Sequence, residues 1–275
     1  MARSNRTDPW TALQHRNYRL LWLGNSFSQF GDHMQQVAHN WLVWQITGSI
    51  SALGFAAFVG IVPRLLFGFF GGPLVDSHNR RRLLAFTQAT ALLFSLLFAL
   101  STASGKITFW LALLSIFSLE STQIVNQTTR QALLQEIVPR EHIASAVSLN
   151  ATGNNLARMT GPAVGGILIP LTGVAGLMFI NAFTFLAILV AVWMMDLPAQ
   201  ACQEKRQSDF IANLKEGYLY IWHNNSLRML IYLGMVSALL IMPFVNLLPA
   251  YVTTVLHKGP QFLGFLTAAF GTGAG

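Results

Sequence analysis

Four ionisable residues interrupt long apolar stretches of this sequence, at Asp32, Arg64, Glu120 and Arg158. A charge in the middle of a helix that crosses hydrocarbon costs about 2.5 kcal/mol or more, so such residues are functional candidates by default. Two of them are acidic and two are basic, and pairing would lower that cost. The sequence leaves two interpretations open, namely carboxylates that exchange protons and permanent ion pairs that fix helix packing.

Polar residues recur around these charges at three- and four-residue steps, which places them on one face of each predicted helix. The first apolar stretch carries Asn25, Gln29, Asp32, Gln36 and His39. The fourth and fifth stretches carry Glu120, Gln123, Gln127 and Arg130, and then Asn154 and Arg158. We expect these faces to line a shared polar cavity, in which Arg64 and Arg158 tune the carboxylates or hold an anionic substrate.

Within that cavity, Asp32 is the first candidate for a carboxylate that carries a proton, and Glu120 is the second. A carboxylate beside a neutral or apolar wall keeps its proton more readily than one in water. His33 and His39 could extend a proton relay, although a lone histidine on a helix is more often a simple hydrogen-bonding residue.

The elements that position these residues are predicted to be membrane-spanning helices. Only 10% of the 275 residues are charged and 53% are hydrophobic, whereas a soluble domain carries about 25% charged residues. Seven apolar blocks are long enough to span hydrocarbon as helices, and an eighth begins near the end. The blocks cover residues 18–46, 51–76, 83–103, 108–134, 142–170, 175–196, 227–255 and 261 onward.

The basic residues between the blocks predict the topology. Thirteen Lys and Arg lie in the gaps on one side, against only Lys106 and Lys258 on the other. By the positive-inside rule we expect a multi-pass protein of the cell inner (plasma) membrane with a cytoplasmic N-terminus. This spread of the formal charge of +7 encodes topology and does not indicate a nucleic-acid partner.

An internal repeat divides the chain. Arg19 to Gly24 resembles Arg228 to Gly234, and Leu53-Gly54-Phe55 recurs as Leu263-Gly264-Phe265, with a shared offset of about 210 residues. Such repeats are typical of secondary transporters. Because the second unit holds only two helices, we expect a C-terminally truncated chain whose complete form has roughly 400 residues.

This organisation predicts four segments. They are a cytoplasmic N-terminal segment (1–17), a six-helix transmembrane bundle (18–197), a cytoplasmic central loop (198–226) and the start of a second bundle (227–275). Apolar residues at helical spacing in the loop predict an amphipathic helix, which either lies on the inner membrane face or packs against cytoplasmic loops.

Enzyme motifs are missing from the sequence. It has no His-Glu-x-x-His, no Gly-x-Ser-x-Gly and no phosphate-binding loop, so we expect neither catalysis nor a cofactor. The single cysteine, Cys202, has no partner for a disulfide or a metal site. Without a nucleotide motif, transport would be driven by an ion or substrate gradient.

Three segments resemble the major facilitator superfamily, and more narrowly its bacterial branch of macrolide, lysophospholipid and siderophore (enterobactin-exporter-like) exporters. Gly72 to Leu84 is similar to the loop signature between helices two and three, with Ser77 replacing a basic residue and Asn79 replacing a glycine. Asn tolerates the left-handed conformation of a tight turn, so we expect the turn to be kept. Residues 130–141 are similar to the link between helices four and five, and residues 161–166 resemble the Gly-Pro-x-x-Gly-Gly motif of exporting antiporters.

The resemblance implies an all-α membrane protein with the major facilitator fold. It would contain a six-helix N-terminal bundle and the first two helices of the C-terminal bundle. The resemblance implies a gating loop in which Asp76 latches the two bundles, made of Gly72, Asp76, Arg80, Arg81, Arg82, Arg130 and Glu136. It also implies a hinge or seal on helix five, at Gly161, Pro162, Gly165 and Gly166.

From these observations we expect proton-coupled efflux of an amphipathic drug, macrolide or siderophore by alternating access, performed by a monomer. Two alternatives stay open. One is a facilitator that moves lysophospholipid or siderophore without protons, and the other is a truncated membrane remnant that does not transport.

Overall fold

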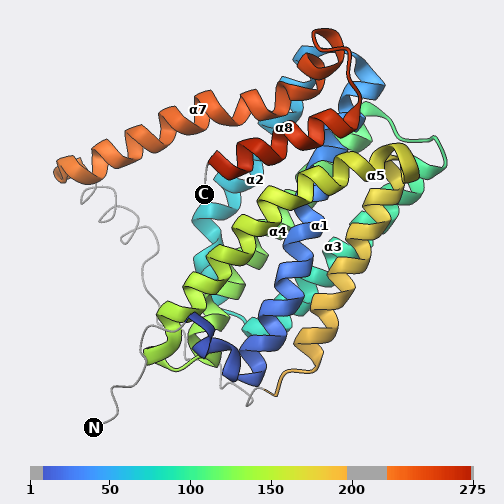
Figure 1. Cartoon of the computed structure of the whole chain (residues 1–275). Helices are drawn as coiled ribbons and strands as arrows, with labels where there is room; N and C mark the ends of the chain where they lie inside the picture. The colour runs from blue at the N-terminus through green and yellow to red at the C-terminus, as the bar shows by residue number, and fades with distance from the viewer. Residues whose placement is uncertain (1–8, 197–221, 274–275) are drawn as a thin grey trace.

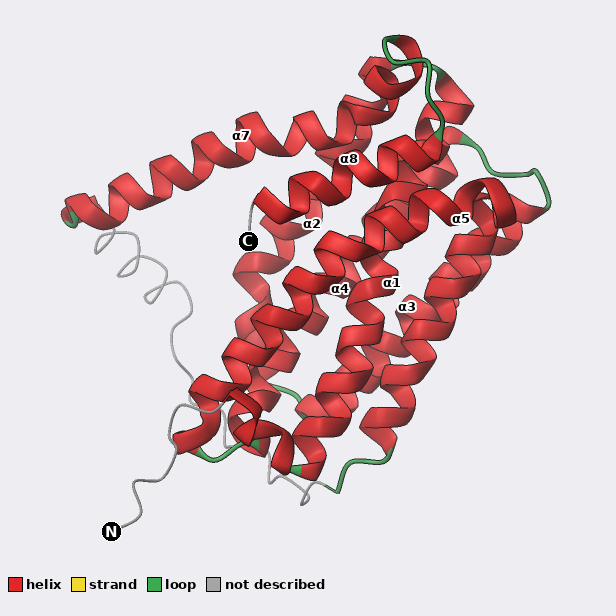
Figure 2. Ribbon diagram, viewed as in Figure 1, coloured by secondary structure: helices red, strands yellow, loops and turns green. Residues whose placement is uncertain are grey.

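The structure is a computed structural model that describes residues 9–196 and 222–273, all of whose regular elements are helices (Figures 1 and 2). The predicted amphipathic helix in residues 198–226 and Cys202 lie largely outside the described residues, as does the side chain of Asp76. The elements are η1 (Pro9–Gln14), α1 (Arg16–Thr47), α2 (Ile50–Asp76), α3 (Arg80–Ala103), α4 (Phe109–Ile137), η2 (Arg140–His142), α5 (Ile143–Trp193), α7 (Asn225–Thr254) and α8 (Pro260–Gly273).

Capping residues set several helix ends. Thr108 and Asn224 accept hydrogen bonds from the first free amides of α4 and α7. Asn79 does the same for α3, accepting from the backbone N–H of Arg82 at 3.1 Å. Its φ of −64° and ψ of 115° are not the left-handed turn expected from the sequence. An N-cap residue needs extended backbone, and that requirement decides the conformation here.

Helix α5 contains both of the blocks predicted at residues 142–170 and 175–196. Gly173 interrupts it with φ 71° and ψ 174°, a conformation that only glycine adopts easily. Figure 1 shows the chain turning back at this end of α5, so that its second half returns beside α3.

Three helices of the described chain are long and apolar enough to cross a membrane, at Ile50–Phe67, Arg80–Ala103 and Arg140–Trp193. The last covers 54 residues, more than two of the roughly 20-residue lengths that one crossing needs. α1 and α4 are also long, but their polar faces lower their hydropathy. The predicted set of seven spans and a partial eighth stays a prediction.

Glycines bring the central helices into close contact. A Cβ atom at Gly24 of α1 would lie 3.0 Å from the Cα of Ile188 in α5. One at Gly161 of α5 would lie 2.9 Å from the Cβ of His33 in α1. α1 therefore packs against both halves of α5, as small residues permit in membrane helices. One apolar cluster around Met34, Leu177 and Met178 fills the space between them.

The last two helices contact the rest of the bundle in different ways. α8 lies along α5, and a Cβ at Gly264 would come within 2.8 Å of the Cα of Gly166. α7 packs on α2 at its C-terminal part, while its N-terminal end extends away from the bundle in Figure 1.

Candidate functional site

A polar cavity of about 940 Å³ lies among α1, α2, α4 and α5, with Asn246 of α7 contributing at one end. Ligand cavities in proteins typically enclose about 300–1,000 Å³, so this one is large enough for a drug-sized molecule. Five of the six residues expected in it from the sequence are part of its lining, namely Asp32, Arg64, Glu120, Gln123 and Asn154.

Asp32 is held by neutral amides. Its Oδ2 accepts a hydrogen bond from Nε2 of Gln123 at 2.8 Å, and its Oδ1 accepts from Nδ2 of Asn181 at 3.5 Å. No Lys or Arg of the described chain forms a salt bridge with this carboxylate. Asp32 therefore sits among groups that can both donate and accept hydrogen bonds.

A chain of hydrogen bonds continues from Asp32 along α1. Asn181 donates to Oε1 of Gln35, and the Gln35 amide lies 3.3 Å from Nε2 of His39. The same His39 nitrogen lies 3.0 Å from Oγ of Ser115 on α4. Sequence reasoning missed Asn181, because this residue stands alone in an apolar helix half.

Glu120 has a different environment. The guanidinium of Arg64 contacts its Oε2 through Nη2 at 3.1 Å and through Nε at 3.3 Å. The side chains are 50% and 29% exposed, respectively. The two carboxylates proposed from the sequence thus differ, since Glu120 is ion-paired and Asp32 is not.

The sequence analysis expected Arg158 in the cavity, but Arg158 is not among the residues that line it. Its Nη2 donates to Oδ1 of Asn155 on the same helix at 3.1 Å. α8 covers this part of α5, where a Cβ at Gly271 would lie 2.8 Å from the carbonyl oxygen of Arg158. The packing of α8 therefore decides which face of α5 meets the cavity.

Arg130 was expected both on the polar face of the fourth helix and in the gating loop, and it lies in the cavity lining. It is 8% exposed, and its Nη1 donates to Oδ1 of Asn25 on α1. The neighbouring loop residues make other contacts. Arg80 pairs with Glu136 of α4 and donates to the carbonyl of Ala132 at 3.2 Å.

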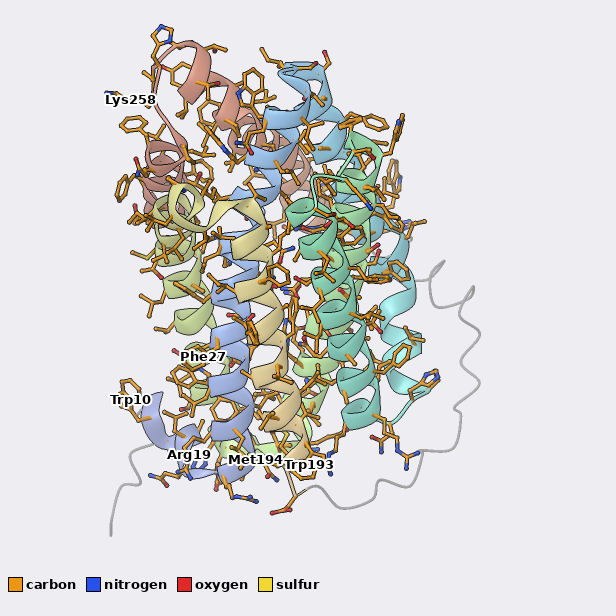
Figure 3. The ribbon with its side chains drawn as sticks, turned by 90° about the vertical axis from the view of Figure 1, so that its right-hand side faces the viewer. Trp10, Arg19, Phe27, Trp193, Met194 and Lys258 are labelled. Carbon is orange, nitrogen blue, oxygen red and sulfur yellow. The ribbon has the colours of Figure 1, made fainter. Side chains whose placement is uncertain are left out.

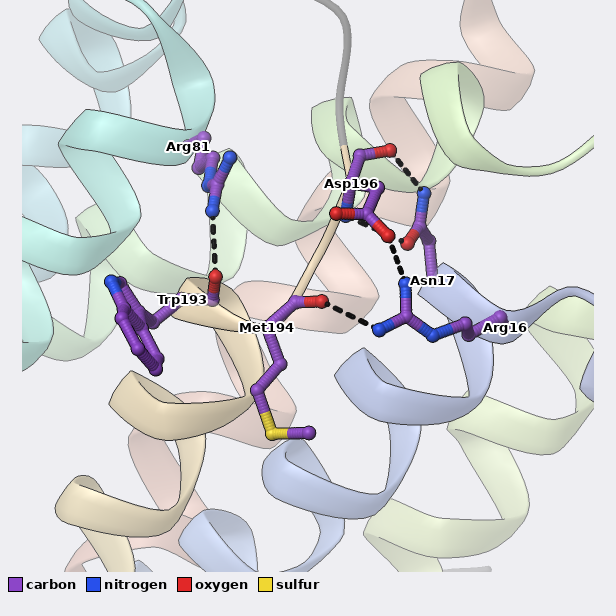
Figure 4. Close-up of polar contacts among 6 residues, drawn as sticks. All are labelled: Arg16, Asn17, Arg81, Trp193, Met194 and Asp196. Atoms are coloured by element: carbon purple, nitrogen blue, oxygen red, sulfur yellow. Dashed lines mark hydrogen bonds and ion pairs between the residues drawn. The ribbon is translucent and has the colours of Figure 1, made fainter.

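A second group of contacts ties the ends of α1, α3 and α5 together (Figure 4). Arg81 donates to the carbonyls of Val192 at 3.1 Å and Trp193 at 2.8 Å. Arg16 pairs with Asp196 and donates to the carbonyl of Met194 at 3.3 Å. Carbonyl acceptors carry no side-chain signal, so these partners could not be read from the sequence.

The glycines of the helix-five motif contact two different helices. A Cβ at Gly165 would lie 3.2 Å from the carbonyl oxygen of Met34 in α1. A Cβ at Gly166 would lie 2.6 Å from the carbonyl oxygen of Pro260, the first residue of α8. Gly161 also contacts α1, and Pro162 is buried inside α5. Gly72, the first glycine of the predicted gating loop, has open space beside it.

An all-helical membrane architecture around a polar cavity is typical of a secondary transporter. The chain belongs to the transmembrane secretion effector family of the major facilitator superfamily, whose sequence profile matches residues 7–275. It is an integral membrane protein, and the family is one of transporters and not of enzymes.

Three relatives illustrate the family. The multidrug efflux pump Tap of Mycolicibacterium fortuitum is 27% identical over 255 residues, covering 88% of this chain and 61% of that protein. Macrolide efflux protein A of Streptococcus pyogenes is 19% identical over 265 residues, covering 94% and 65%. The staphyloferrin A transporter of Staphylococcus aureus is 28% identical over 156 residues, covering 54% and 36%. The chain thus spans about three fifths of the length of the first two.

Proposed function

We propose that the protein exports an amphipathic small molecule from the cytoplasm in exchange for protons, and that Asp32 carries the proton. The observation that supports this is that Asp32 forms no salt bridge within the described chain and that its two hydrogen-bond partners are the neutral amides of Gln123 and Asn181. An amide can reorient and accept a hydrogen bond from a protonated carboxyl group. Asp32 can therefore change its protonation state without leaving a buried partner unsatisfied.

The cavity is closed at one end, which supports an inward-facing state. At that end Nδ2 of Asn40 donates to Oδ1 of Asn246 at 3.0 Å, and Gly166 contacts Gly264. Toward the other end the lining continues to Gln135 and Ile143, near the start of α5. In the proposed cycle, α7 and α8 part from α1 and α5 while the opposite end closes.

The orientation rests on the distribution of basic and aromatic residues. Trp10, Arg19 and Trp193 gather at one end of the molecule and Lys258 lies at the other (Figure 3). Tryptophans prefer the membrane–water interface, and basic residues accumulate on the cytoplasmic side. We place the end that carries Arg19 and Arg81 in the cytoplasm and the protein in the inner (plasma) membrane.

The test is efflux of a fluorescent derivative of a macrolide without a basic amine from cells that express the protein, with and without a protonophore. Wild-type efflux should stop with the protonophore, and Asp32→Asn should abolish it, since the amide cannot release a proton. Glu120→Gln is the matched control and should retain protonophore-sensitive efflux, because Glu120 is paired with Arg64. If Asp32→Asn kept protonophore-sensitive efflux, the proton assignment would be wrong.

Other outcomes separate the alternatives. Wild-type efflux that ignores the protonophore would support a facilitator that needs no protons. Stable membrane insertion without any efflux would support a chain that does not transport.

A further inference from the structure

We infer that the cavity accepts a neutral amphiphile carrying several hydroxyl, carbonyl or amide groups, and that it discriminates against lipophilic cations. This inference rests on the proposed transport function and names the chemical class of its substrate. It follows from the kinds of side chain that line the cavity, from which of them lack a protein partner, and from the balance of charge.

Carboxamides dominate the polar part of the lining. Thirteen of the lining residues are Asn or Gln, and no Phe, Tyr or Trp is among those that the structure describes there. A carboxamide offers two N–H donors and a carbonyl acceptor, which match the hydroxyl and carbonyl groups of a neutral polar molecule. Lipophilic cations are recognised mainly by the faces of Trp, Tyr and Phe, and the described lining offers none of these three.

Four of these amides form a row along α4. Gln123, Gln127, Gln131 and Gln135 follow one another at four-residue steps and all line the cavity. Residues so spaced lie on one helix face, and this row spans about 18 Å at the helical rise of 1.5 Å per residue. The row extends from the level of Asp32 toward the proposed cytoplasmic opening.

Most of the row is available to a ligand. Gln123 donates to Asp32. In the part of the chain that the structure describes, the amides of Gln127, Gln131 and Gln135 have no protein partner, and Gln127 and Gln131 are exposed to the cavity. Three adjacent carboxamides with free donors and acceptors can bind successive hydroxyl or carbonyl groups of one molecule.

The side chain of Gln29 on α1 offers a further hydrogen-bond acceptor to a ligand in the cavity. The side-chain oxygen of Gln29 lies in the cavity lining, is buried, and accepts no hydrogen bond from the described residues. A buried acceptor without a partner is destabilising, because it has lost its hydrogen bonds to water. A substrate O–H or N–H group that reached Gln29 would supply the missing hydrogen bond.

The charges of the described lining residues cancel. Glu120 is paired with Arg64, and the buried Arg130, which donates to Asn25, balances Asp32. A cation in the cavity therefore finds no uncompensated negative field. Ile143, Val147 and Ala151 of α5 supply aliphatic surface in the same lining, so the matching ligand has an aliphatic part beside its polar groups.

Equilibrium binding to the purified chain in lipid nanodiscs tests this inference without any proton gradient. The probes are tritiated octyl glucoside, which is neutral and rich in hydroxyl groups, and tetraphenylphosphonium, a lipophilic cation. We expect saturable binding of octyl glucoside that tetraphenylphosphonium does not displace. The double variant Gln127→Leu/Gln131→Leu should weaken octyl glucoside binding about tenfold, the equivalent of two hydrogen bonds.

Gln45→Leu is the matched control, because Gln45 is an exposed glutamine of α1 outside this cavity and its loss should leave binding unchanged. Absence of octyl glucoside binding, displacement by tetraphenylphosphonium, or equal affinity in the double variant would each overturn the inference. The displacement experiment with tetraphenylphosphonium uses the unmutated chain, so it tests the inference even if the double variant does not fold. Retained binding together with protonophore-insensitive efflux would instead refute only the proton coupling.

Discussion

Asn40 of α1 donates a hydrogen bond to Asn246 of α7 over 3.0 Å, although the two residues are 206 positions apart in the chain. Their helices belong to the two units of the repeat that the sequence predicts, so in that interpretation this bond joins one unit to the other. Both side chains form part of the cavity lining, at the end that we propose is closed. Four predictions start from this and related contacts.

The Asn40–Asn246 contact should break and reform during transport. In a Cys202→Ser background, we expect the double variant Asn40→Cys/Asn246→Cys to be cross-linked through disulfide bonds by a short bis-methanethiosulfonate reagent and to lose efflux. Removing the cross-link with a reductant should restore efflux. Gln45→Cys/Asn246→Cys is the control and should not cross-link. Full efflux by the cross-linked protein would show that these helices need not separate.

Helices α5 and α8 lie so close together that a methyl group added at their contact should destabilise the protein. A Cβ at Gly264 would lie 2.5 Å from the carbonyl oxygen of Pro162, so Gly264→Ala should cost about 1–3 kcal/mol through overpacking. Thermal unfolding in detergent measures the change. Gly54→Ala on α2 is the control, because nothing lies within 4 Å of its Cβ position. An unchanged melting temperature for Gly264→Ala would mean that the two helices are not in contact.

Arg81 should stabilise the C-terminal end of α5 by binding its last carbonyls. Arg81→Met removes two charge-assisted hydrogen bonds, to Val192 and Trp193, and should destabilise the protein by about 1–3 kcal/mol. Arg82→Met is the control, because the Arg82 side chain is exposed and forms no hydrogen bond or ion pair in the described chain. It should leave the free energy of unfolding almost unchanged. Equal unfolding temperatures for both variants would argue against this role.

The Arg64–Glu120 pair should contribute little to stability. Arg64 is half exposed in the cavity, and pairs of this kind are worth about 1 kcal/mol or less. A double-mutant cycle with Arg64→Gln and Glu120→Gln, followed by thermal unfolding, measures the coupling. A coupling of several kcal/mol would indicate that the pair is a structural element of the bundle and not a part of the solvated lining.

Helical periodicity alone predicted much of the site. Gln29, Asp32 and Gln36 share one face of α1 because they recur at three- and four-residue steps, and Glu120, Gln123 and Gln127 do so on α4. Gln131 and Gln135 continue this four-residue spacing, but the sequence analysis followed the face only as far as Arg130 and missed them. The superfamily motifs indicated the major facilitator fold, which the family match confirms.

The tertiary structure decided which faces meet. Periodicity orients residues about one helix axis, but it does not set the rotation or height of a helix relative to its neighbours. Those depend on close packing at positions such as Gly161 and Gly264. For this reason only the packed bundle pairs Arg64 with Glu120, gives Asp32 the amide of Asn181, and covers Arg158 with α8.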